Sequence, residues 1–412
     1  MEQELFSAAL GLVPPWRVGR SEFDAEAGRL DLYLEFPRGA RFPCPQPECL
    51  ERECPVHDTD GKTWRHLDFF QYHAYLHAKL PRVRCPEHGV RQVAVGWARP
   101  ESGFTLLFEA LLITFAAAMP VAQVAKFTGV QDTRIWRVLD HYVKRERAKL
   151  DFSTVEKVGV DETAAARGQD YVSIFMDPDT RRVLFATEGR DSTTVERFVA
   201  DLKAHGGYPE FIGNVTCDMS VAFISGVNQY LSNADITFDR FHIMKNLGEA
   251  VDEVRRAEAK TRPTLLKRTR WLWLTNRANL SEAQQRELVW LTRPSVQLAT
   301  ARAHRWREDF QGFYDQPADQ AEAYLTRWCA GAMRSRLQPV KDFVAMLKRH
   351  LDGILAWHRS HLTTGLLEGT NSLVQAAKAR ARGYRNKQYM ITIIYLLAAK
   401  LPRPSLSVTH TM

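Results

Sequence analysis

The chain has few cysteines and no apolar run long enough to cross a bilayer. Its most apolar stretch, residues 106–122, is interrupted by Glu109 and Pro120 and is shorter than the ~20 residues that a membrane helix needs. The N-terminal segment MEQELFSAAL lacks the basic region and long apolar core of an export signal. We therefore expect a cytoplasmic protein without a transmembrane helix. Four of the six cysteines fall between residues 44 and 85, a clustering that favours a metal site over disulfides.

The charge is only moderately one-sided. The 412 residues include 56 Lys and Arg against 48 Asp and Glu, which gives a net charge of +8 and a pI near 9.2. This balance suits a polyanionic partner if the cations cluster, and it suits an ordinary basic protein equally well. Since 45% of the residues are hydrophobic, the chain can bury more than one core, and we expect two to four folding units.

The clustered cysteines lie in short motifs that suit zinc. Two Cys-Pro-x-His tetrapeptides, residues 54–57 and 85–88, flank an alternating stretch that predicts a hairpin. Zinc takes four ligands at tetrahedral corners, and two such turns held by a hairpin form a zinc ribbon. The candidate ligands are Cys44, Cys49, Cys54, His57, Cys85 and His88. Cys85 and His88 belong to every scheme, whereas the other pair is either Cys44 with Cys49 or Cys54 with His57. Buried free cysteines with incidental histidines are the alternative.

From Phe104 the hydrophobic period becomes helical. One buried helix is predicted over 104–119, then a short helix, a turn at Gly129, and a second helix capped by Asp132 or Thr133. This is the layout of a helix-turn-helix, although similar helix pairs occur in plain bundles. The second helix would present arginines to a major groove, and its basic end would meet phosphates. The candidate DNA contacts are Arg134, Arg137, Lys144 and Arg145.

Strand patterns dominate after residue 153. The strand 158–161 ends in Asp161 and two more strands follow; then come a helix, a strand ending at Asp218, a helix and the strand 234–243. This is the order expected of a ribonuclease-H-like α/β core. In that order the first and fourth strands lie side by side, so Asp161 and Asp218 come together at one sheet edge. Carboxylates so close suit two magnesium ions roughly 3.5–4 Å apart, which would promote attack on a phosphodiester.

A helical insertion of over a hundred residues interrupts this core. Its segment 254–277 contains eight cations in 24 residues, interleaved with Trp271 and Trp273. Such a segment can hold phosphates and stack on or wedge between bases. An equally good interpretation places the tryptophans in a core and the arginines in solvent. The candidate phosphate contacts here are Arg268 and Arg270.

The last informative segment predicts a helix with two distinct faces. Glu368 shares one face with Asn371, Gln375, Lys378 and Arg382. The other face carries Leu366, Leu373, Ala377 and Ala381, and we expect this small apolar side to lie against a sheet. Glu368 then becomes a candidate third metal ligand. The candidate DNA contacts are Lys378, Arg380, Arg382 and Arg385.

Two polar residues just beyond a core strand, Asp239 and His242, could support the site by contacting its metal ligands. A strand-end aspartate and a helix-capping histidine are at least as good an interpretation. Glu162 is the other carboxylate beside Asp161, but on a continuing strand it points to the opposite side.

Five segments together resemble the DDE transposases of bacterial insertion sequences, specifically the ISL-three type with an N-terminal zinc ribbon. They are CPVHDTDGKTWRHLDFFQYHAYLHAKLPRVRCPEHG, VGVDETAAARGQDYVSIFMD, VTCDMSVAFISGV, ITFDRFHIMKN and LLEGTNSLVQAAKARARGYRN. The resemblance runs over nearly the whole chain, and by it Asp161, Asp218 and Glu368 match the catalytic acidic triad. One departure is the spacing of Cys44 and Cys49, which have four residues between them where a ribbon usually has two.

The resemblance implies an enzyme that binds the terminal inverted repeats of its own element, nicks the ends and joins the 3′ hydroxyls to target DNA. It implies two magnesium or manganese ions, a structural zinc ion, and a bacterial protein associated with the nucleoid. Because two element ends are paired, it also implies at least a dimer. A domesticated, non-catalytic DNA-binding regulator and a structure-specific nuclease on the same core remain alternatives.

The expected fold is therefore a multidomain α/β chain. The catalytic core should resume after the insertion with C-terminal helices. The expected parts are a zinc-ribbon region over 1–100, a helix-turn-helix domain over 101–152, the first part of the core over 153–245, the helical insertion over 246–361 and the C-terminal core helices over 362–412.

Overall fold

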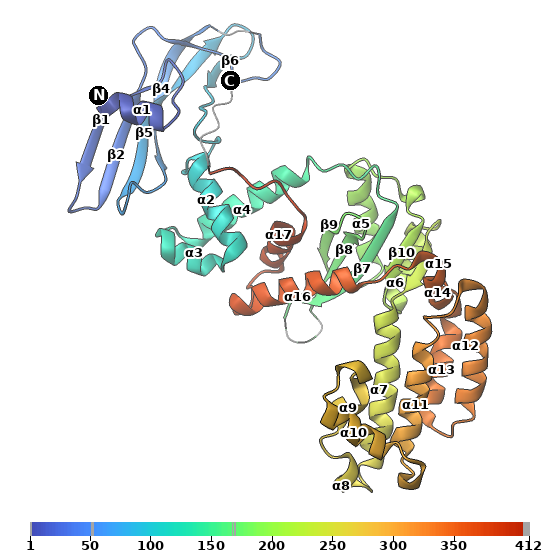
Figure 1. The fold of residues 1–412 in the computed structure, drawn as a ribbon. Coiled ribbons are helices and arrows are strands. Elements are labelled where there is room, and N and C mark those ends of the chain that lie inside the picture. The colour runs from blue at the N-terminus through green and yellow to red at the C-terminus, as the bar shows by residue number, and fades with distance from the viewer. Residues whose placement is uncertain (1, 51–52, 167, 169, 407–412) are drawn as a thin grey trace. The chain divides into compact units, whose positions relative to one another are not determined.

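The structure is a computed structural model that describes residues 2–50, 53–166, 168 and 170–406, without the side chain of Leu366 (Figure 1). The chain forms two compact units. One contains the residues up to Lys144 and the segment that begins at Pro402, and the other runs from Arg145 to Leu401. In the described part of the chain, every helix is too short or too polar to span a bilayer.

A six-stranded sheet fills the N-terminal part of the first unit. It follows α1 (Glu2–Ala9) and consists of β1 (Arg17–Asp24), β2 (Arg29–Glu35), β3 (Arg41–Phe42), β4 (Cys54–Arg65), β5 (His73–Cys85) and β6 (Gly89–Gln92). The strand order is β1-β2-β5-β4-β3, with β6 paired to β5. β4 and β5 are antiparallel, so the predicted hairpin between the two Cys-Pro-x-His motifs is confirmed.

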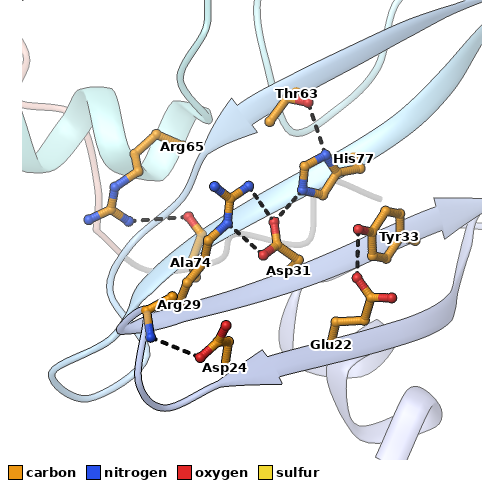
Figure 2. A network of polar contacts seen from close by, with 10 residues as sticks. Glu22, Asp24, Arg29, Asp31, Tyr33, Thr63, Arg65, Ala74 and His77 are labelled. Atoms are coloured by element: carbon orange, nitrogen blue, oxygen red, sulfur yellow. Dashed lines mark hydrogen bonds and ion pairs between the residues drawn. The ribbon is translucent and has the colours of Figure 1, made fainter.

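Alternation along β2 divides this sheet into an apolar and a polar face. Leu30, Leu32 and Leu34 are buried in one cluster with Trp64. The residues between them form the polar face seen in Figure 2, where Asp31 contacts both Arg29 and His77. There His77 also hydrogen-bonds Thr63 at 2.9 Å, and Tyr33 donates to Glu22 at 2.8 Å.

Three helices follow the sheet: α2 (Leu106–Ala118), α3 (Val121–Thr128) and α4 (Asp132–Arg147). Thr105 caps α2, because its side chain accepts a hydrogen bond from the Phe108 amide. α3 ends at Gly129, whose φ of +70° is a left-handed conformation that glycine adopts at little cost. The predicted helix, turn and second helix are therefore confirmed.

The second unit is built on a five-stranded sheet. Its elements are β7 (Lys157–Ala164), β8 (Tyr171–Asp177), β9 (Arg182–Glu188), α5 (Thr193–Ala204), the short 3-10 helix η1 (Pro209–Phe211), β10 (Asn214–Cys217), α6 (Val221–Tyr230) and β11 (Asp235–Phe238). The strand order is β11-β10-β7-β8-β9, and β7 pairs with β10 in parallel. The predicted order of strands and helices, and the adjacency of the first and fourth strands, are confirmed.

The predicted strand over 234–243 is too long. β11 ends at Phe238, and the helix α7 (Arg240–Glu258) begins directly after it. The Asp239 side chain accepts a hydrogen bond from the Phe241 amide at 3.1 Å and so caps the helix. α7 then continues into the insertion, so the expected boundary at 245/246 falls inside one continuous helix.

Helices make up the rest of the second unit. They are α8 (Pro263–Leu266), α9 (Arg270–Leu274), η2 (Arg277–Asn279), α10 (Glu282–Leu291), η3 (Pro294–Val296), α11 (Ala299–Gln311), α12 (Ala318–Met333), α13 (Gln338–Arg349), α14 (Leu351–Leu355), α15 (Trp357–Ser360), α16 (Gly365–Arg380) and α17 (Lys387–Ala398). α7 extends away from the sheet with α9 and α11 packed on it (Figure 1). α16 returns to β7, and α17 packs against β9.

Candidate functional sites

A cluster of sulfur and nitrogen ligands lies in the first unit. One ligand atom from each of Cys44, Cys49, Cys85 and His88 lies within 4.8 Å of all the others. The Sγ atoms of Cys49 and Cys85 are 3.6 Å apart, and Nδ1 of His88 lies 3.6 Å from Sγ of Cys85 and 3.8 Å from Sγ of Cys44. A zinc tetrahedron with metal–ligand bonds of about 2.0–2.3 Å has edges of about 3.5–3.8 Å. The four side chains therefore fit a zinc ion.

The surroundings of this cluster favour metal-binding protonation states. Burial alone would raise the pKa of the Cys85 thiol, but hydrogen bonds from the backbone and side chain of His88 outweigh it and lower the pKa to about 6. The thiolate is the form that binds zinc. Nε2 of His88 lies 3.9 Å from a Glu48 carboxylate oxygen, which can orient the ring for coordination through Nδ1.

The other candidate pair lies outside the group of four ligand atoms. Cys54 begins β4, where it pairs with Phe42 of β3 and is buried among apolar side chains. His57 lies at an irregularity of β4, and its Nδ1 is 3.1 Å from the Arg84 guanidinium. Neither residue belongs to the four-ligand cluster. Of the two alternatives, the structure brings Cys44 and Cys49 to Cys85 and His88.

In the second unit, Asp161 lies within β7 and not at its end as expected, because the strand continues to Ala164. Val158 and Val160 point into the core, so Gly159 and Asp161 face the opposite side, where α16 lies. A Cβ on Gly159 would come within 2.7 Å of Cδ1 of Leu367, so a larger residue there would force this buried leucine side chain to shift. Asn371 of α16 donates a hydrogen bond from Nδ2 to Oδ2 of Asp161 at 2.6 Å.

The polar face of α16 continues along the end of β7. Gln375 donates to the Thr163 hydroxyl at 2.7 Å and to the Ala164 carbonyl at 3.0 Å, and the Lys378 amine donates to the same carbonyl at 2.7 Å. β7 pairs with β10 only over residues 157–159. Side chains of α16 therefore meet polar groups at the end of β7 that β10 does not reach.

This contact corrects the expected orientation of the helix. We expected the side with Leu366, Leu373, Ala377 and Ala381 to meet the sheet. Of these four residues, Leu373 is 43% exposed, whereas Ala377 is buried and Ala381 is half-buried. The Leu366 side chain lies outside the described residues. Leu367 and Val374 are the buried leucine and valine of α16.

Three acidic residues near α16 have raised pKa values. Burial raises the pKa of Asp161, and repulsion from the Asp218 carboxylate raises it further. The pKa of Glu162 is raised by the same two effects, although Glu162 also lies 3.7 Å from Arg190. Burial raises the pKa of Glu368, and the carboxylates of Asp239 and Asp161 add to it. The Asp161 carboxylate therefore interacts with the charges of both Asp218 and Glu368, and Asp161 and Glu368 are partly dehydrated.

Glu368 also has an unsatisfied oxygen. Its Oε1 atom is buried and has no hydrogen-bond partner among the described residues. A buried carboxylate oxygen without a donor is costly, and a bound cation would compensate it. The negative charge and this oxygen fit the divalent metal that the sequence predicts.

Asp239 and His242 lie closer to Glu368 than expected. One ligand atom from each of these three residues lies within 4.8 Å of the other two. Asp239 is fully buried and accepts hydrogen bonds from the Thr363 hydroxyl at 3.0 Å and the Thr364 amide at 3.1 Å. It therefore joins the start of α7 to the segment just before α16. Among the described residues, Asp161 and Asp218 belong to no group of three ligand atoms this close.

The candidate DNA contacts of α4 are mostly in exposed positions. Arg134 and Arg137 are exposed, and the Arg134 guanidinium stacks on Phe104 at 4.1 Å from the ring centroid. Lys144 is ion-paired to Asp140 at 2.8 Å, and Arg145 to Glu146 at 2.7 Å.

The remaining cationic candidates are in the second unit. Arg268, Arg270, Arg380, Arg382 and Arg385 are exposed. Lys378 differs from these exposed arginines because its side chain is half-buried against the end of β7. Neither the role of Gly159 nor the contact between Asn371 and Asp161 was predicted from the sequence. The helix face that Asn371 shares with Glu368 was the signal that could have indicated this contact.

Three family models match consecutive parts of the chain. Residues 41–88 match a zinc finger of the transposases of IS204, IS1001, IS1096 and IS1165. Residues 93–143 match the helix-turn-helix domain of transposase family ISL3, and residues 158–394 match the transposase domain of the same family. The zinc-finger match and the cysteine cluster together support a structural zinc ion. The other two matches imply DNA binding and the use of a divalent metal.

Two named relatives are similar over most of their length. The chain is 31% identical to the transposase for insertion sequence element IS1001 of Bordetella parapertussis, over 92% of this chain and 95% of the relative. It is 28% identical to the transposase for insertion sequence element IS1557 of Mycobacterium tuberculosis, over 85% of this chain and 84% of the relative. With the family match over residues 158–394, these similarities show that the chain belongs to the ISL3 family of DDE transposases.

Proposed function

We propose that this transposase binds the terminal inverted repeats of its own insertion sequence and cleaves and joins DNA strands at a site formed by Asp161, Asp218 and Glu368. The observation that supports the proposal is the position of the Asp161 carboxylate on β7, which interacts with the charges of both Asp218, at the end of β10, and Glu368, on α16. The pKa values of Asp161 and Glu368 are raised, and Oε1 of Glu368 is buried without a partner.

Magnesium or manganese ions held by these three carboxylates would activate a hydroxyl nucleophile and stabilise the leaving oxygen of a phosphodiester. The chain's own residues hold the carboxylates in place. Asn371 orients Asp161 through the 2.6 Å hydrogen bond to Oδ2. Asp239 anchors the segment before α16 through Thr363 and Thr364, and so sets the position of Glu368. His242 lies near Asp161 and Glu368, where its charge would lower the pKa of both.

The zinc ligands in this proposal are Cys44, Cys49, Cys85 and His88. Their distances suit a tetrahedral ion. Cys44 and Cys49 come from the loop before β4, and Cys85 and His88 come from the end of β5 and the turn after it. An ion there would join these two segments across a small apolar cluster around Phe42 and Val83. Its role is structural, because four protein ligands leave no open coordination position.

Recognition of DNA is assigned to several cationic surfaces. Arg134 and Arg137 of α4 would enter a major groove, as the second helix of a helix-turn-helix does. Arg380, Arg382 and Arg385 are exposed at the end of α16 and just beyond it, where they would contact phosphates. Pairing of two element ends requires at least a dimer.

The experiment is an Asp161→Asn substitution tested on a supercoiled plasmid that carries the inverted repeats flanking the gene. We expect nicking to be lost and binding to the repeats to be retained. Asp235→Asn is the matched control, because Asp235 is an exposed aspartate on β11 of the same sheet, separated from β7 by β10, and it should nick normally. A D161N protein that still nicks would remove Asp161 from the mechanism. A wild-type protein that binds the repeats but never nicks would instead be a regulator, and one that cuts without the repeats would be a nuclease.

A further inference from the structure

The two tryptophans of the basic segment have opposite environments. Trp273 is fully buried, and its Nε1 donates to the Thr269 hydroxyl at 3.1 Å. Trp271, two residues earlier on the short helix α9, is 65% exposed. The structure therefore assigns Trp273 to the core and leaves the Trp271 indole on the surface.

The residues next to Trp271 are fixed by packing and hydrogen bonds. Leu272 and Trp273 pack in the main hydrophobic cluster, and the buried Thr269 hydroxyl donates to the Leu266 carbonyl at 2.8 Å. Arg268 has a φ of +68°, a left-handed conformation that is costly for a non-glycine residue and persists only where the surroundings impose it. The loop before Trp271 is thus held in one conformation.

The buried carboxylate of Asp252 forms ion pairs with three arginines, one of which contacts the Trp271 indole. Asp252 of α7 lies 2.7 Å from Arg255, 3.4 Å from Arg256 and 3.5 Å from Arg270. The Arg270 guanidinium lies 5.1 Å from the centroid of the Trp271 ring. Arg270 is therefore held between Asp252 and the indole, close enough for a cation–π contact.

The segment around Trp271 is strongly cationic. Residues 255–271 contain seven Lys and Arg residues and one carboxylate, Glu258. Glu258 is engaged elsewhere, because its carboxylate accepts hydrogen bonds from the Ala299 and Thr300 amides at 2.8 Å each. Lys267, Arg268 and Arg270 are all exposed beside Trp271. This combination of a fixed aromatic ring and phosphate-binding cations is what proteins use to bind single-stranded nucleic acid.

We propose that Trp271 is a stacking platform for an unpaired base of the DNA strand that the enzyme processes, with Lys267, Arg268 and Arg270 on the adjoining phosphates. This inference rests on the proposed function. The occupant is a strand with an unpaired base and not an intact duplex, because bases inside a duplex are already stacked on each other.

The spacing of Asp252 and His242 along α7 gives the approximate separation between the Trp271 platform and the carboxylates. Asp252 follows His242 by ten residues on this one helix, which corresponds to a rise of about 15 Å. That rise corresponds to about four nucleotides of a strand. The platform would therefore hold a base displaced a few nucleotides from the cleaved bond.

The test measures binding of the full-length protein to a fluorescein-labelled oligodeoxythymidylate of about 20 nucleotides, and to a duplex of equal length, by fluorescence anisotropy. We expect Trp271→Ala to weaken oligodeoxythymidylate binding about tenfold and to leave duplex binding within about twofold of the wild type. Trp271→Phe should retain most of the affinity. Trp290→Ala is the matched control, since Trp290 is 45% exposed on α10 of the same insertion, and it should bind normally.

The inference is overturned if the wild type does not bind the oligodeoxythymidylate, if W271A binds it as the wild type does, or if W290A loses as much affinity. It is also overturned if W271A alters only the sedimentation of the protein, because Trp271 would then serve a protein contact. Plasmid nicking is assayed separately. If W271A binds the oligodeoxythymidylate normally and the wild-type enzyme nicks the plasmid, only the stacking role of Trp271 is refuted. If binding depends on Trp271 but the wild-type enzyme never nicks, only the proposed function is refuted.

Discussion

Asn371 donates a hydrogen bond to Asp161 across 210 residues of sequence, over a distance of 2.6 Å between Nδ2 and Oδ2. It joins the helix that follows the insertion to the first strand of the core. The carboxylate of Asp161 is therefore oriented by the same helix that carries Glu368, one turn earlier. The helical insertion separates these residues in sequence and not in space.

Loss of this hydrogen bond should reduce catalysis without unfolding the protein. We expect Asn371→Ala to lower the rate of plasmid nicking about 10–100-fold, the usual effect of removing a residue that orients a metal ligand. The affinity for the inverted repeats should be unchanged. Leu373→Ala is the control on the exposed side of α16. An N371A enzyme that nicks at the wild-type rate would show that Asp161 needs no support from α16.

Asp239 should matter for stability as well as for catalysis. Asp239→Ala removes the cap of α7 and leaves the buried Thr364 amide without its acceptor. We expect a loss of about 2–3 kcal/mol in the free energy of unfolding, measured by urea denaturation followed through tryptophan fluorescence. Asp235→Ala, a change at an exposed carboxylate, should cost under about 0.5 kcal/mol. Equal stability of D239A and D235A would contradict the structural role of Asp239.

Zinc binding separates the two candidate ligand pairs. A protein with Cys85→Ser and His88→Ala should lose its bound zinc in a metal assay, because two of four tetrahedral ligands are gone. A protein with Cys54→Ser and His57→Ala should retain it, since neither residue lies in the cluster. The ligand assignment fails if the second protein loses zinc and the first keeps it.

The stability of the first unit should depend on pH through His66. Burial, with a smaller effect of Arg65, lowers the pKa of His66 from 6.5 to about 4. The unfolded chain therefore takes up a proton at a higher pH than the folded chain does. The stability that the neutral ring contributes is complete above pH 6.5 and is lost as the pH falls towards 4, by up to about 3 kcal/mol.

His66→Asn tests this dependence, because asparagine is neutral throughout and can still hydrogen-bond the Thr105 hydroxyl as Nδ1 of His66 does at 2.9 Å. We expect thermal denaturation of the wild type to shift to lower temperature between pH 6.5 and 4 more steeply than that of H66N. Identical slopes in the two proteins would show that His66 takes up its proton at the same pH in the folded and the unfolded chain.

The sequence predicted the core well, because its evidence was the order of elements. Three strands, a helix, a strand, a helix and a strand imply that β7 and β10 are neighbours, and the structure confirms this pairing. The end of β11 was not predictable from alternation. Ile236, Phe238 and Ile243 continue an apolar pattern across Asp239, and the capping contact with the Phe241 amide is visible only in three dimensions.

The orientation of α16 shows a second limit. A helical period shows which residues share a face, but not which face meets the sheet. Here Gly159 has no side chain to keep α16 away, and polar groups at the end of β7 offer hydrogen-bond partners. The face of α16 that meets the sheet is therefore the one with Asn371 and Gln375. The zinc cluster shows the same limit, because spacing treats Cys49 and Cys54 alike. Both pack in one buried cluster, but only Cys49 belongs to the group of four ligand atoms.

One panel of nicking rates decides whether Asp161, Asp218 and Glu368 form the catalytic site. The panel compares Asp161→Asn, Asp218→Asn and Glu368→Gln with Asp239→Asn on the same plasmid, with magnesium and with manganese. We predict that each of the first three loses at least about a hundredfold in rate with either ion, and that D239N retains more activity than any of them. Wild-type rates in D161N and D218N, with activity lost in D239N and E368Q, would contradict the claim and place the metal at Asp239, His242 and Glu368.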